Sequence, residues 1–388
     1  MEIQARNSGP RSRERFLATK LFMRQVKVAL VLLLASLAGQ TMAQSTPQQV
    51  AGTGWQALTS GSTAPAVAVS PTMTYVAWHG QSTSNIWFSS YNGSTWSQQE
   101  TVGGSGWTAQ TSASPALAWD FYKNELWLAW VGNTDQKIYF SIWNGSSWSQ
   151  QVIISGSGWT AESTTAPTLI YDQDMYVAWK GVSSNNIWYT NWNYPGWSNQ
   201  QTVSGSWGSA QTISSPALVG DYLGPVMLWK GQETVYDYMW ASWSEPLEDI
   251  GFSQQVQVNC STDSFTAKTS EAPAGVALGL SGYEGAPWVD VIFYNTGGGT
   301  LAYSKVIDSD EICWTVPAVV GGTSDGTSWN PYTYLPPAVS SAQEWSSATT
   351  TMLVWTNEVT VENPSNPIPE GAVMYMDPTT LPGLTAYH

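Results

Sequence analysis

The chain has little of what metal-dependent and nucleophilic enzymes use. Its 388 residues include two cysteines and two histidines, and charged residues make up 11% of the total. One histidine is the C-terminal His388, so a Ser-His-Asp site would have to use His79, and no Cys/His cluster could hold zinc. A phosphate-cradling glycine loop is also missing from the sequence. We therefore predict no catalytic residue and no metal ligand.

Arginine and long apolar runs are confined to the start of the chain. The apolar run Val28–Ala38 follows a basic segment, and the small residues of Thr41-Met42-Ala43 precede Gln44. This order is typical of a signal peptide and its cleavage site, and the run is too short to span a membrane. We predict a signal peptide over residues 1–43, with Met23 as a possible true start, and a secreted or periplasmic protein that is not inserted in a membrane.

The rest of the chain has a strong excess of negative charge. Seven of the 13 basic residues, including every arginine, and two of the 28 acidic residues precede residue 44. Six lysines, no arginine and a formal charge near −20 remain. Such a surface repels nucleic acids and anionic lipids, so we expect neither as a partner.

The two cysteines, Cys260 and Cys313, are too few to be the main source of stability in a chain of this length. Their even number and the predicted export favour one disulfide between them. Two unpaired, buried thiols are the alternative.

A repeat of about fifty residues dominates the sequence. Trp55, Trp107 and Trp159 each follow a Gly/Ser turn, Trp207 follows in Gly-Ser-Trp, and the steps between them are 52, 52 and 48 residues. A period in this range indicates a solenoid, a propeller or an array. Four short strands per unit, separated by turn residues such as Asn92-Gly93, are typical of a β-propeller blade.

Six units can be aligned on the prolines that precede their first strands. These are Pro65, Pro115, Pro167, Pro216, Pro273 and Pro337. Second strands end at or near an aromatic residue, as in Tyr75-Val76-Ala77-Trp78, and the fourth strand carries a Gly-x-x-Trp-Ser-Gln-Gln phrase. We expect third strands to begin near Ile86, Ile138, Ile187, Tyr236, Leu301 and Ala372.

The two ends of the mature chain match each other. Unit six stops after its third strand, near Met376, whereas Gln48-Gln49-Val50 resembles the fourth-strand ends of units one to three. Pairing of this segment with unit six would leave no open sheet edge between the ends. We predict an all-β, six-bladed β-propeller of four-stranded antiparallel blades over residues 44–388, closed by the N-terminal strand, with blades starting near residues 55, 107, 159, 207, 265 and 330.

The repeat resembles the tryptophan-rich β-propeller repeats of bacterial lectins of the bangle-lectin type, and more loosely those of fucose-binding lectins and Asp-box propellers. The matching residues are Ala166-Pro167-Thr168-Leu169, Trp179-Lys180-Gly181, Asn186-Ile187-Trp188-Tyr189 and Gly196-Trp197-Ser198. The resemblance covers units one to four well and units five and six poorly. Sialidases of this architecture bind their substrate carboxylate with arginines, so the lack of arginine argues strongly against that activity.

Candidate binding residues repeat at the end of the ring where the chain crosses between blades. A tryptophan ring beside a hydrogen-bond donor suits a pyranose, because the apolar face of the sugar stacks on the ring and its hydroxyls bind the donor. The candidate ligand-binding residues are Trp55, Trp107, Trp159, Trp207, His79, Lys180 and Lys230. The alternative is that these tryptophans only wedge between blades.

Acidic residues repeat at the opposite end. Asp120, Asp172 and Asp221 each lie five residues after a strand-start proline, where an aspartate can bond its own turn. A carboxylate ring that binds Ca²⁺ or serves as acid and base is the alternative. The runs Asp172-Gln173-Asp174 and Asp308-Ser309-Asp310-Glu311 lack the spacing of a known calcium loop.

These observations predict a secreted, non-catalytic β-propeller that binds glycans or polysaccharides at several weak, repeated sites, without a cofactor. The enzyme alternative is a propeller glycoside hydrolase or lyase, which would have one distinct pocket with perturbed carboxylates in the irregular units five and six. A structural or protein-binding propeller is the third possibility and would expose a broad apolar patch.

Overall fold

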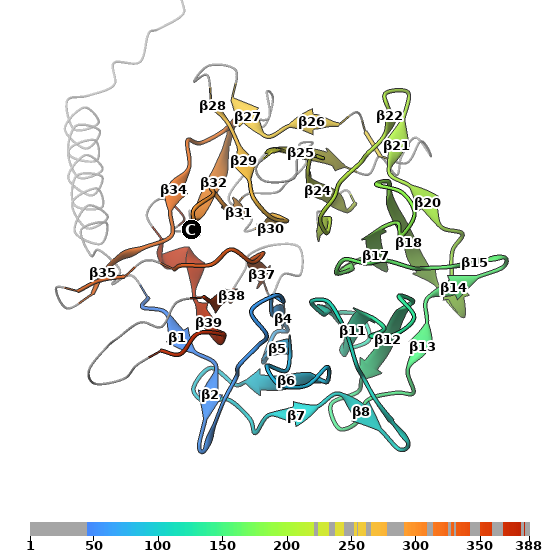
Figure 1. The fold of residues 1–388 in the computed structure, drawn as a ribbon, viewed down its shortest axis with the longest axis horizontal. Helices are drawn as coiled ribbons and strands as arrows, with labels where there is room; N and C mark the ends of the chain where they lie inside the picture. The colour runs from blue at the N-terminus through green and yellow to red at the C-terminus, as the bar shows by residue number, and fades with distance from the viewer. Residues whose placement is uncertain are drawn as a thin grey trace, which may run out of the picture. The chain divides into compact units, whose positions relative to one another are not determined.

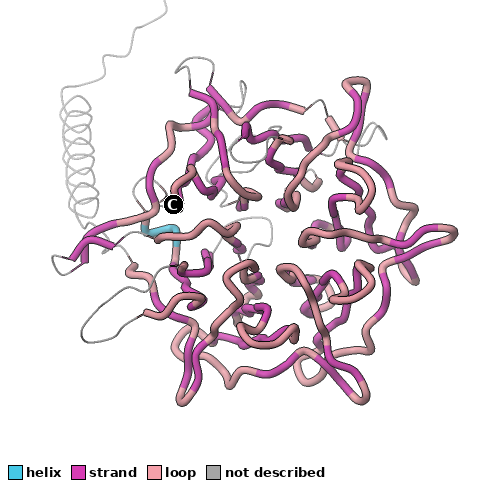
Figure 2. Tube along the Cα trace, in the orientation of Figure 1, coloured by secondary structure: helices cyan, strands magenta, loops and turns pink. Residues whose placement is uncertain are grey.

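The computed structural model describes residues 45–220, 224–232, 237–243, 252–253, 255–260, 265–277, 291–308, 313–324, 327–329, 331–341, 350–358, 368–381 and 384. These residues belong to one compact unit, Ser45–His388. Six antiparallel sheets are arranged around a common centre (Figure 1), and the helical content of the described part is the single 3-10 turn Pro378–Thr380 (Figure 2).

The first three blades are the most regular. Each has an inner strand, two longer strands and an outer strand of two residues, and blade 3 has a second outer strand of two residues. Blade 1 contains β4 (Ala66–Val69), β5 (Thr74–His79), β6 (Ile86–Tyr91) and β7 (Glu100–Thr101); blade 2 contains β10 (Ala116–Asp120), β11 (Glu125–Val131), β12 (Ile138–Trp143) and β13 (Val152–Ile153); blade 3 contains β16 (Thr168–Asp172), β17 (Asp174–Lys180), β18 (Ile187–Asn193), β19 (Gly196–Trp197) and β20 (Gln201–Thr202).

The other three blades keep this order with more variation. Blade 4 contains β23 (Ala217–Val219), β24 (Val226–Lys230), β25 (Asp237–Trp243) and β26 (Val256–Gln257), with β29 (Lys268–Thr269) also paired to β25. Blade 5 contains β30 (Ala274–Val276), β31 (Val291–Asn295), β32 (Leu301–Asp308), β33 (Cys313–Trp314) and β34 (Ala318–Val319). Blade 6 contains β37 (Ala338–Ser341), β38 (Thr351–Asn357), β39 (Ala372–Met376) and β1 (Gln48–Gln49).

A two-stranded hairpin precedes the inner strand of every blade and lies at the rim of the ring (Figure 1). The hairpins are β2 (Ala51–Gly52) with β3 (Trp55–Gln56), β8 (Gly103–Gly104) with β9 (Trp107–Thr108), β14 (Ser155–Gly156) with β15 (Trp159–Thr160), β21 (Ser204–Gly205) with β22 (Gly208–Ser209), β27 (Asn259–Cys260) with β28 (Phe265–Thr266), and β35 (Gly322–Ser324) with β36 (Thr327–Trp329). Gly106 has a φ of 82°, which explains why glycine stands before the hairpin tryptophan.

The hydrophobic core is divided into six clusters, each between two neighbouring blades. One cluster joins Val354 and Tyr375 of blade 6 to Val67 and Trp78 of blade 1. The inner strands follow one another around the centre, and β37 of blade 6 lies next to β4 of blade 1. The first and last blades are therefore packed together in the same way as the others.

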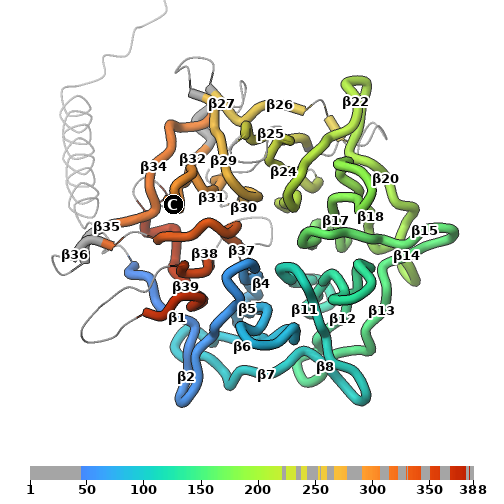
Figure 3. The backbone as a smooth tube through the Cα atoms, viewed as in Figure 1, coloured from blue at the N-terminus to red at the C-terminus, as the bar shows by residue number. Residues whose placement is uncertain are grey.

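The N-terminal segment completes the sheet of blade 6. Gln48 and Gln49 pair antiparallel with Tyr375 and Met374, and Figure 3 shows β1 in blue beside β39 in red. The Val50 amide continues the contact by donating to the Val373 oxygen at 2.8 Å.

The predicted six-bladed, all-β architecture is confirmed. Third strands begin at or within one residue of the predicted positions, and unit three forms a strand, β19, at the predicted Gly196-Trp197, but in units one and two the fourth strand begins later than predicted. Trp96 belongs to the preceding turn, where it bridges Tyr91, and the outer strand starts only at Glu100. The Ser97 amide donates to the Ser90 oxygen at 2.7 Å, but the Ser90 amide donates to the Ser97 hydroxyl at 3.0 Å. A side chain therefore replaces one of the two backbone hydrogen bonds at that point.

The predicted signal peptide, residues 1–43, lies outside the described residues. Within the described part of the chain, no helix has the length and apolar character needed to cross a bilayer.

Candidate functional site: the tryptophan hairpins

Three of the hairpin tryptophans stack on buried tryptophans of the blade that follows them. Trp107 lies parallel to Trp130, with ring centroids 6.3 Å apart and an interplanar angle of 4°. Trp55 repeats this on Trp78 at 6.2 Å and 3°, and Trp159 repeats it on Trp179 at 6.4 Å and 12°. The second-strand rings are at most 2% exposed, whereas all three hairpin rings are half-buried.

Hairpin glycines let these rings fold back onto the backbone. A Cβ atom at Gly104 would lie 2.6 Å from Nε1 of Trp107, and one at Gly156 would lie 2.3 Å from Nε1 of Trp159. No side chain fits in that space. The Gly-x-Gly-Trp phrase therefore fixes the position of each indole as well as the turn.

A third aromatic residue pairs with each buried tryptophan across the strands, and it was not among the predicted site residues. Cross-strand pairing places Trp87 beside Trp78, Tyr139 beside Trp130, and Trp188 beside Trp179. Tyr139 stacks on Trp130 at 5.8 Å and 18°. The recurring aromatic residue one position after the third-strand isoleucine was the available sequence signal.

Blade 2 adds a carboxylate to its stack. The Tyr139 hydroxyl donates to Oδ2 of Asp135 at 2.8 Å, and the Lys137 ammonium lies 3.8 Å from the same oxygen. Burial and the neighbouring Asp135 raise the pKa of Tyr139 to about 12. The phenol therefore stays protonated at neutral pH and holds Asp135 in place.

The predicted donors after the second-strand tryptophans make structural contacts instead of standing beside the ring of their own strand. Lys230 is buried, and its ammonium donates to the Ser270 oxygen at 2.8 Å in the crossing to the next blade. Burial lowers the pKa of His79, while a hydrogen bond with the Thr111 backbone opposes the shift. Successive residues of a strand point to opposite faces, so His79 and Trp78 face different blades.

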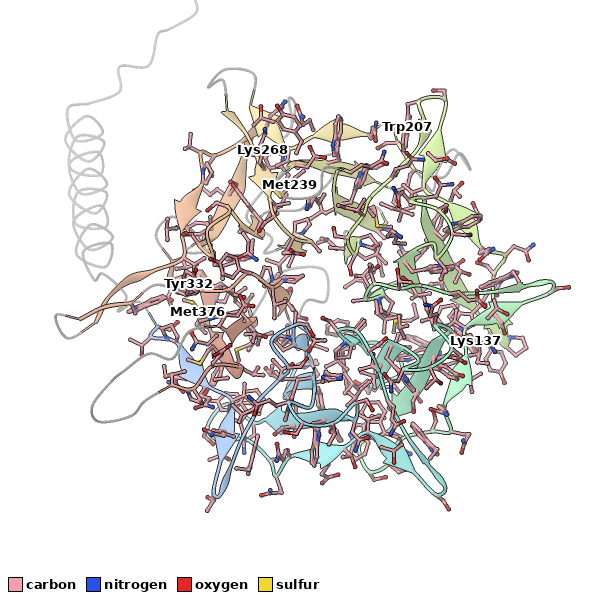
Figure 4. All side chains as sticks on the ribbon, in the orientation of Figure 1. Lys137, Trp207, Met239, Lys268, Tyr332 and Met376 are labelled. Atoms are coloured by element: carbon pink, nitrogen blue, oxygen red, sulfur yellow. The ribbon has the colours of Figure 1, made fainter. Side chains whose placement is uncertain are left out.

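Lys180 and Trp207, both predicted to bind ligand, each use a polar group for a contact with the backbone. Lys180 is half-buried, and its ammonium donates to the Gly181 oxygen at 3.2 Å. Trp207, labelled on the β21–β22 hairpin in Figure 4, uses its indole N–H for the Ser253 oxygen at 3.1 Å. Trp207 is thus tied to blade 4, whereas the other three hairpin tryptophans rest on a ring.

Uncharged amides line the crossings beside the stacks. Nε2 of Gln110 donates to Oδ1 of Asn85 at 3.3 Å, and Nε2 of Gln211 donates to Oδ1 of Asn186 at 3.0 Å. Gln232 continues the second pair by donating to Oε1 of Gln211 at 2.8 Å. These exposed groups offer both donors and acceptors without charge.

A second set of tryptophans, in the turns before the outer strands, packs against the preceding blade. Trp148 of blade 2 meets the edge of Phe88 of blade 1, and Trp197 of blade 3 meets Phe140 of blade 2. Trp96 meets Tyr375 of blade 6 in the same manner. These contacts favour a packing role for this set.

Of the acidic residues at the other end, Asp120 serves its turn. Oδ1 of Asp120 accepts from the Tyr122 and Lys123 amides at 3.0 and 2.9 Å, as the turn interpretation predicts. Asp172 is buried, and Asp221 lies outside the described residues. No group of three or more His, Cys, Asp or Glu residues able to hold a metal occurs within the described ranges.

The two cysteines lie on strands that approach each other. Both Cα atoms of β27 are within 8 Å of both Cα atoms of β33, so Cys260 and Cys313 have neighbouring backbones. Their side chains are outside the described part, and the disulfide stays a prediction.

The comparisons with known proteins concern the fold. No protein-family model matches the chain, and no curated protein matches it. Similar solved structures include a triple arginine-to-alanine mutant of AofleA from Arthrobotrys oligospora, with 12% identity, a TM-score of 0.52, and coverage of 81% of this chain and 84% of that one.

Two further structures show the range of proteins with a similar chain path. The Aleuria aurantia lectin, described as a six-bladed β-propeller with a novel fucose recognition mode, has 11% identity, a TM-score of 0.49, and coverage of 77% of this chain and 88% of that one. The Hadza microbial sialidase Hz136 has 9% identity, a TM-score of 0.49, and coverage of 80% and 64%. At these identities the likeness concerns the fold alone, and the six blades of this chain are given by its own strand pairing.

Proposed function

We propose that the protein is a carbohydrate-binding β-propeller whose sites are the hairpin tryptophans Trp55, Trp107 and Trp159. The observation that carries the proposal is the repeated parallel stack, which presents a half-buried indole on a rigid buried ring at three equivalent positions. An indole held in this way loses little conformational freedom on binding, which favours stacking of a sugar ring.

The surroundings of the stacks also suit a sugar. Its hydroxyls need neutral donors and acceptors, and the amides of Asn85, Gln110, Asn186 and Gln211 supply both. Lys230 does not belong to the proposed site because it is buried, and Trp207 is a weaker candidate because its N–H is already used. Repeated weak sites would act together on a polymer through avidity.

A glycan array followed by titration of the best ligand tests this proposal. Single Trp107→Ala and Trp159→Ala variants should each weaken binding stepwise, and the triple variant with Trp55→Ala should lose at least about tenfold in avidity. Tyr122→Ala is the matched control, since Tyr122 is 84% exposed on a turn at the other end of the ring.

Folding of each variant is checked by its circular dichroism spectrum and melting curve. A folded triple variant that binds glycans as tightly as the parent would contradict the proposal. If the parent binds no glycan and instead retains a protein ligand, the interaction-propeller alternative replaces it. High salt should leave binding intact, because stacking does not depend on ion pairs.

We also propose that the protein is exported by its leader. N-terminal sequencing of the protein from its native host should begin at Gln44. A mature chain that still carries residues 1–43 would overturn this proposal.

A further inference from the structure

Blades 4 to 6 gather carboxylates that act on one another at the crossing end, where the charged residues of blades 1 to 3, such as Asp135 and Lys137, stand beside an aromatic stack. Glu358 directly follows β38, at the position that Gln81 and Asn133 occupy after β5 and β11. Glu271 follows β29 in the crossing from blade 4 to blade 5, where the corresponding residue of the crossing into blade 2 is Ala113. Two carboxylates thus replace an amide and a methyl group of the regular blades.

Hydrogen bonds fix the main chain around both glutamates. The Glu358 amide donates to the Tyr332 oxygen at 3.2 Å, and the Tyr334 amide donates to Oε2 of Glu358. Tyr332, labelled in Figure 4, also shares a hydrogen bond with the Tyr334 hydroxyl. In the other crossing, the Glu271 oxygen accepts from Oγ1 of Thr269 at 2.9 Å.

Buried polar groups without a partner lie between the two glutamates. The Asn295 oxygen accepts from the Ser270 amide, next to Glu271, and Nδ2 of Asn295 donates to the Leu335 oxygen, next to Tyr334. Asn295 is 0% exposed, yet its Oδ1 and the Oγ of Ser270 find no hydrogen-bond partner in the described part of the chain. Buried polar atoms of this kind are normally satisfied by an ordered water or a ligand group.

The charges of the cluster act on one another. Burial raises the pKa of Glu271, Lys230 opposes this shift, and the charge of Glu358 adds to it. Burial also raises the pKa of Glu358, the Tyr334 N–H opposes this shift, and Glu370 adds to it. Lys230 in turn has its pKa lowered by burial, while Glu271 and Asp237 oppose that shift. Two carboxyl groups whose pKa values are shifted by burial and by each other's surroundings are suited to acid–base chemistry.

We propose that Glu271 and Glu358 form an acid–base pair that hydrolyses a glycosidic bond. This inference rests on the proposed carbohydrate binding: the tryptophan hairpins hold the polymer, and the pair in blades 4 to 6 cuts it.

The reaction needs water and no other co-reactant. Glu271 donates its proton to the leaving glycosidic oxygen as the bond from that oxygen to the anomeric carbon breaks. Glu358 takes a proton from the water molecule whose oxygen forms the new bond to that carbon. The products are a free reducing end and an alcohol, and solvent carries the proton from Glu358 back to Glu271.

The contacts assign the two roles. The Tyr334 N–H stabilises the ionised form of Glu358, which suits a base, whereas burial and, to a smaller extent, the charge of Glu358 raise the pKa of Glu271, which suits an acid. The Lys230 ammonium, fixed on the Ser270 oxygen, stabilises the Glu271 carboxylate that remains after proton transfer.

Reducing-end release tests the reaction on the full mature chain. The probes are soluble xylan, arabinan, galactan and mixed-linkage glucan. The parent should release reducing ends from the polymer that it binds, and Glu271→Gln and Glu358→Gln should each lower the rate by about 100-fold or more. Glu100→Gln is the matched control, because Glu100 is exposed on the outer strand of blade 1. Binding by both glutamine variants should remain as in the parent.

A second measurement does not depend on the choice of substrate. Carbon NMR of chain labelled at the glutamate carboxyls should show that Glu358→Gln lowers the pKa of Glu271, whereas Glu100→Gln leaves it unchanged. An unchanged Glu271 pKa in the Glu358→Gln variant would overturn the pairing. A parent that binds one of the polymers without cutting it would overturn hydrolysis and leave the binding proposal standing.

Discussion

Blades 1 to 3 and blades 4 to 6 share a topology and differ in what fills the crossing end of the ring. In the first half, each interface repeats a hairpin tryptophan, a buried second-strand tryptophan and a third-strand aromatic residue. In the second half, blade 4 still has Trp207, Trp229 and Trp240 at these positions, and the crossing region also holds Lys230, Glu271 and Glu358. The second half therefore brings two carboxylates and a buried lysine together, whereas the charged pair of the first half, Asp135 and Lys137, stands beside an aromatic stack.

The difference shows that the fold does not require the aromatic stack. Blade 6 keeps the buried tryptophan, Trp355, on its second strand, but Met374 pairs with it where the regular blades have an aromatic residue. Its sheet is nevertheless complete and packs against blade 1. A blade can therefore complete its sheet and pack against its neighbour without the stack.

The largest effect should come from breaking the join between the two halves. Deleting residues 45–50 removes β1, the buried Val50 and the Ser45 amide bond to Oγ1 of Thr380. The loss of Val50 burial and of several hydrogen bonds should cost about 5 kcal/mol of unfolding free energy. Chemical denaturation measures it.

Gln48→Ala is the control for this deletion. It removes only the acceptor of the Tyr375 hydroxyl, 2.7 Å away, and should cost about 1 kcal/mol. An unfolding curve of the deletion variant that coincides with that of the parent would mean that the N-terminal strand does not close the ring.

The sequence predicts this architecture well because its signals are local. The prolines before the inner strands, the aromatic second-strand ends and the repeated hairpins each mark an element without reference to the rest of the fold. In units one and two the outer strands begin later than predicted: before Glu100 a serine hydroxyl replaces one backbone bond, and a two-residue strand leaves no alternating pattern to read.

A smaller effect should separate the two kinds of interface. Trp130 stacks on Trp107 and Tyr139, whereas Trp355 makes no ring contact within the part of the chain that the structure describes. Both are 1% exposed, so both alanine variants lose a buried indole at a cost of about 3–5 kcal/mol.

Trp130→Ala should cost about 1–3 kcal/mol more than Trp355→Ala, because it also loses two ring pairs. Denaturant titration of both variants gives the difference directly. Equal losses would show that the stack adds nothing to stability, and the hairpin rings would then serve the ligand alone.

The site was less predictable than the fold, since it depends on which face each side chain occupies. His79 and Lys230 follow a tryptophan in sequence, and alternation turns them toward the next crossing. The Glu271–Glu358 pair joins two segments far apart in the chain, and nothing in the local pattern relates them. The enzyme alternative drawn from the sequence placed perturbed carboxylates in the irregular units and named no residue.

The disulfide would brace the irregular half. A bridge between Cys260 and Cys313 links the hairpin before blade 5 to β33 of that blade, whose backbones already lie side by side. Cys260→Ser with Cys313→Ser should lower the unfolding free energy by about 2–4 kcal/mol. The same loss should follow reduction of the parent.

Mass spectrometry of the unreduced, digested protein should show the linked peptides. Free thiols in denatured, unreduced protein would refute the bridge. Blades 1 to 3 contain no cysteine, so any effect of reduction belongs to the second half.

The smallest effect should be a pH dependence that belongs to blades 4 to 6. Glu271 and Glu358 have raised pKa values in the folded state, so the native protein binds more protons than the unfolded chain between the ordinary and the raised values. Their contribution to stability is fully present below the ordinary glutamate pKa and is lost as pH rises through the raised one. Melting temperatures measured from pH 4 to pH 8, in ~0.5-unit steps, should therefore fall less steeply in Glu271→Gln and Glu358→Gln than in the parent.

Lys230, Asp237 and Glu370 face the same cluster and remain in both variants, so the change in slope isolates the two glutamates. Glu100→Gln should keep the parental slope, because Glu100 is exposed in the regular half. In that half, Tyr139 beside Asp135 has a pKa of about 12 and does not titrate in this range. If the melting temperatures of the glutamine variants depend on pH as steeply as those of the parent, Glu271 and Glu358 do not interact and are each solvated by water. The two halves of the ring would then differ only in their aromatic residues.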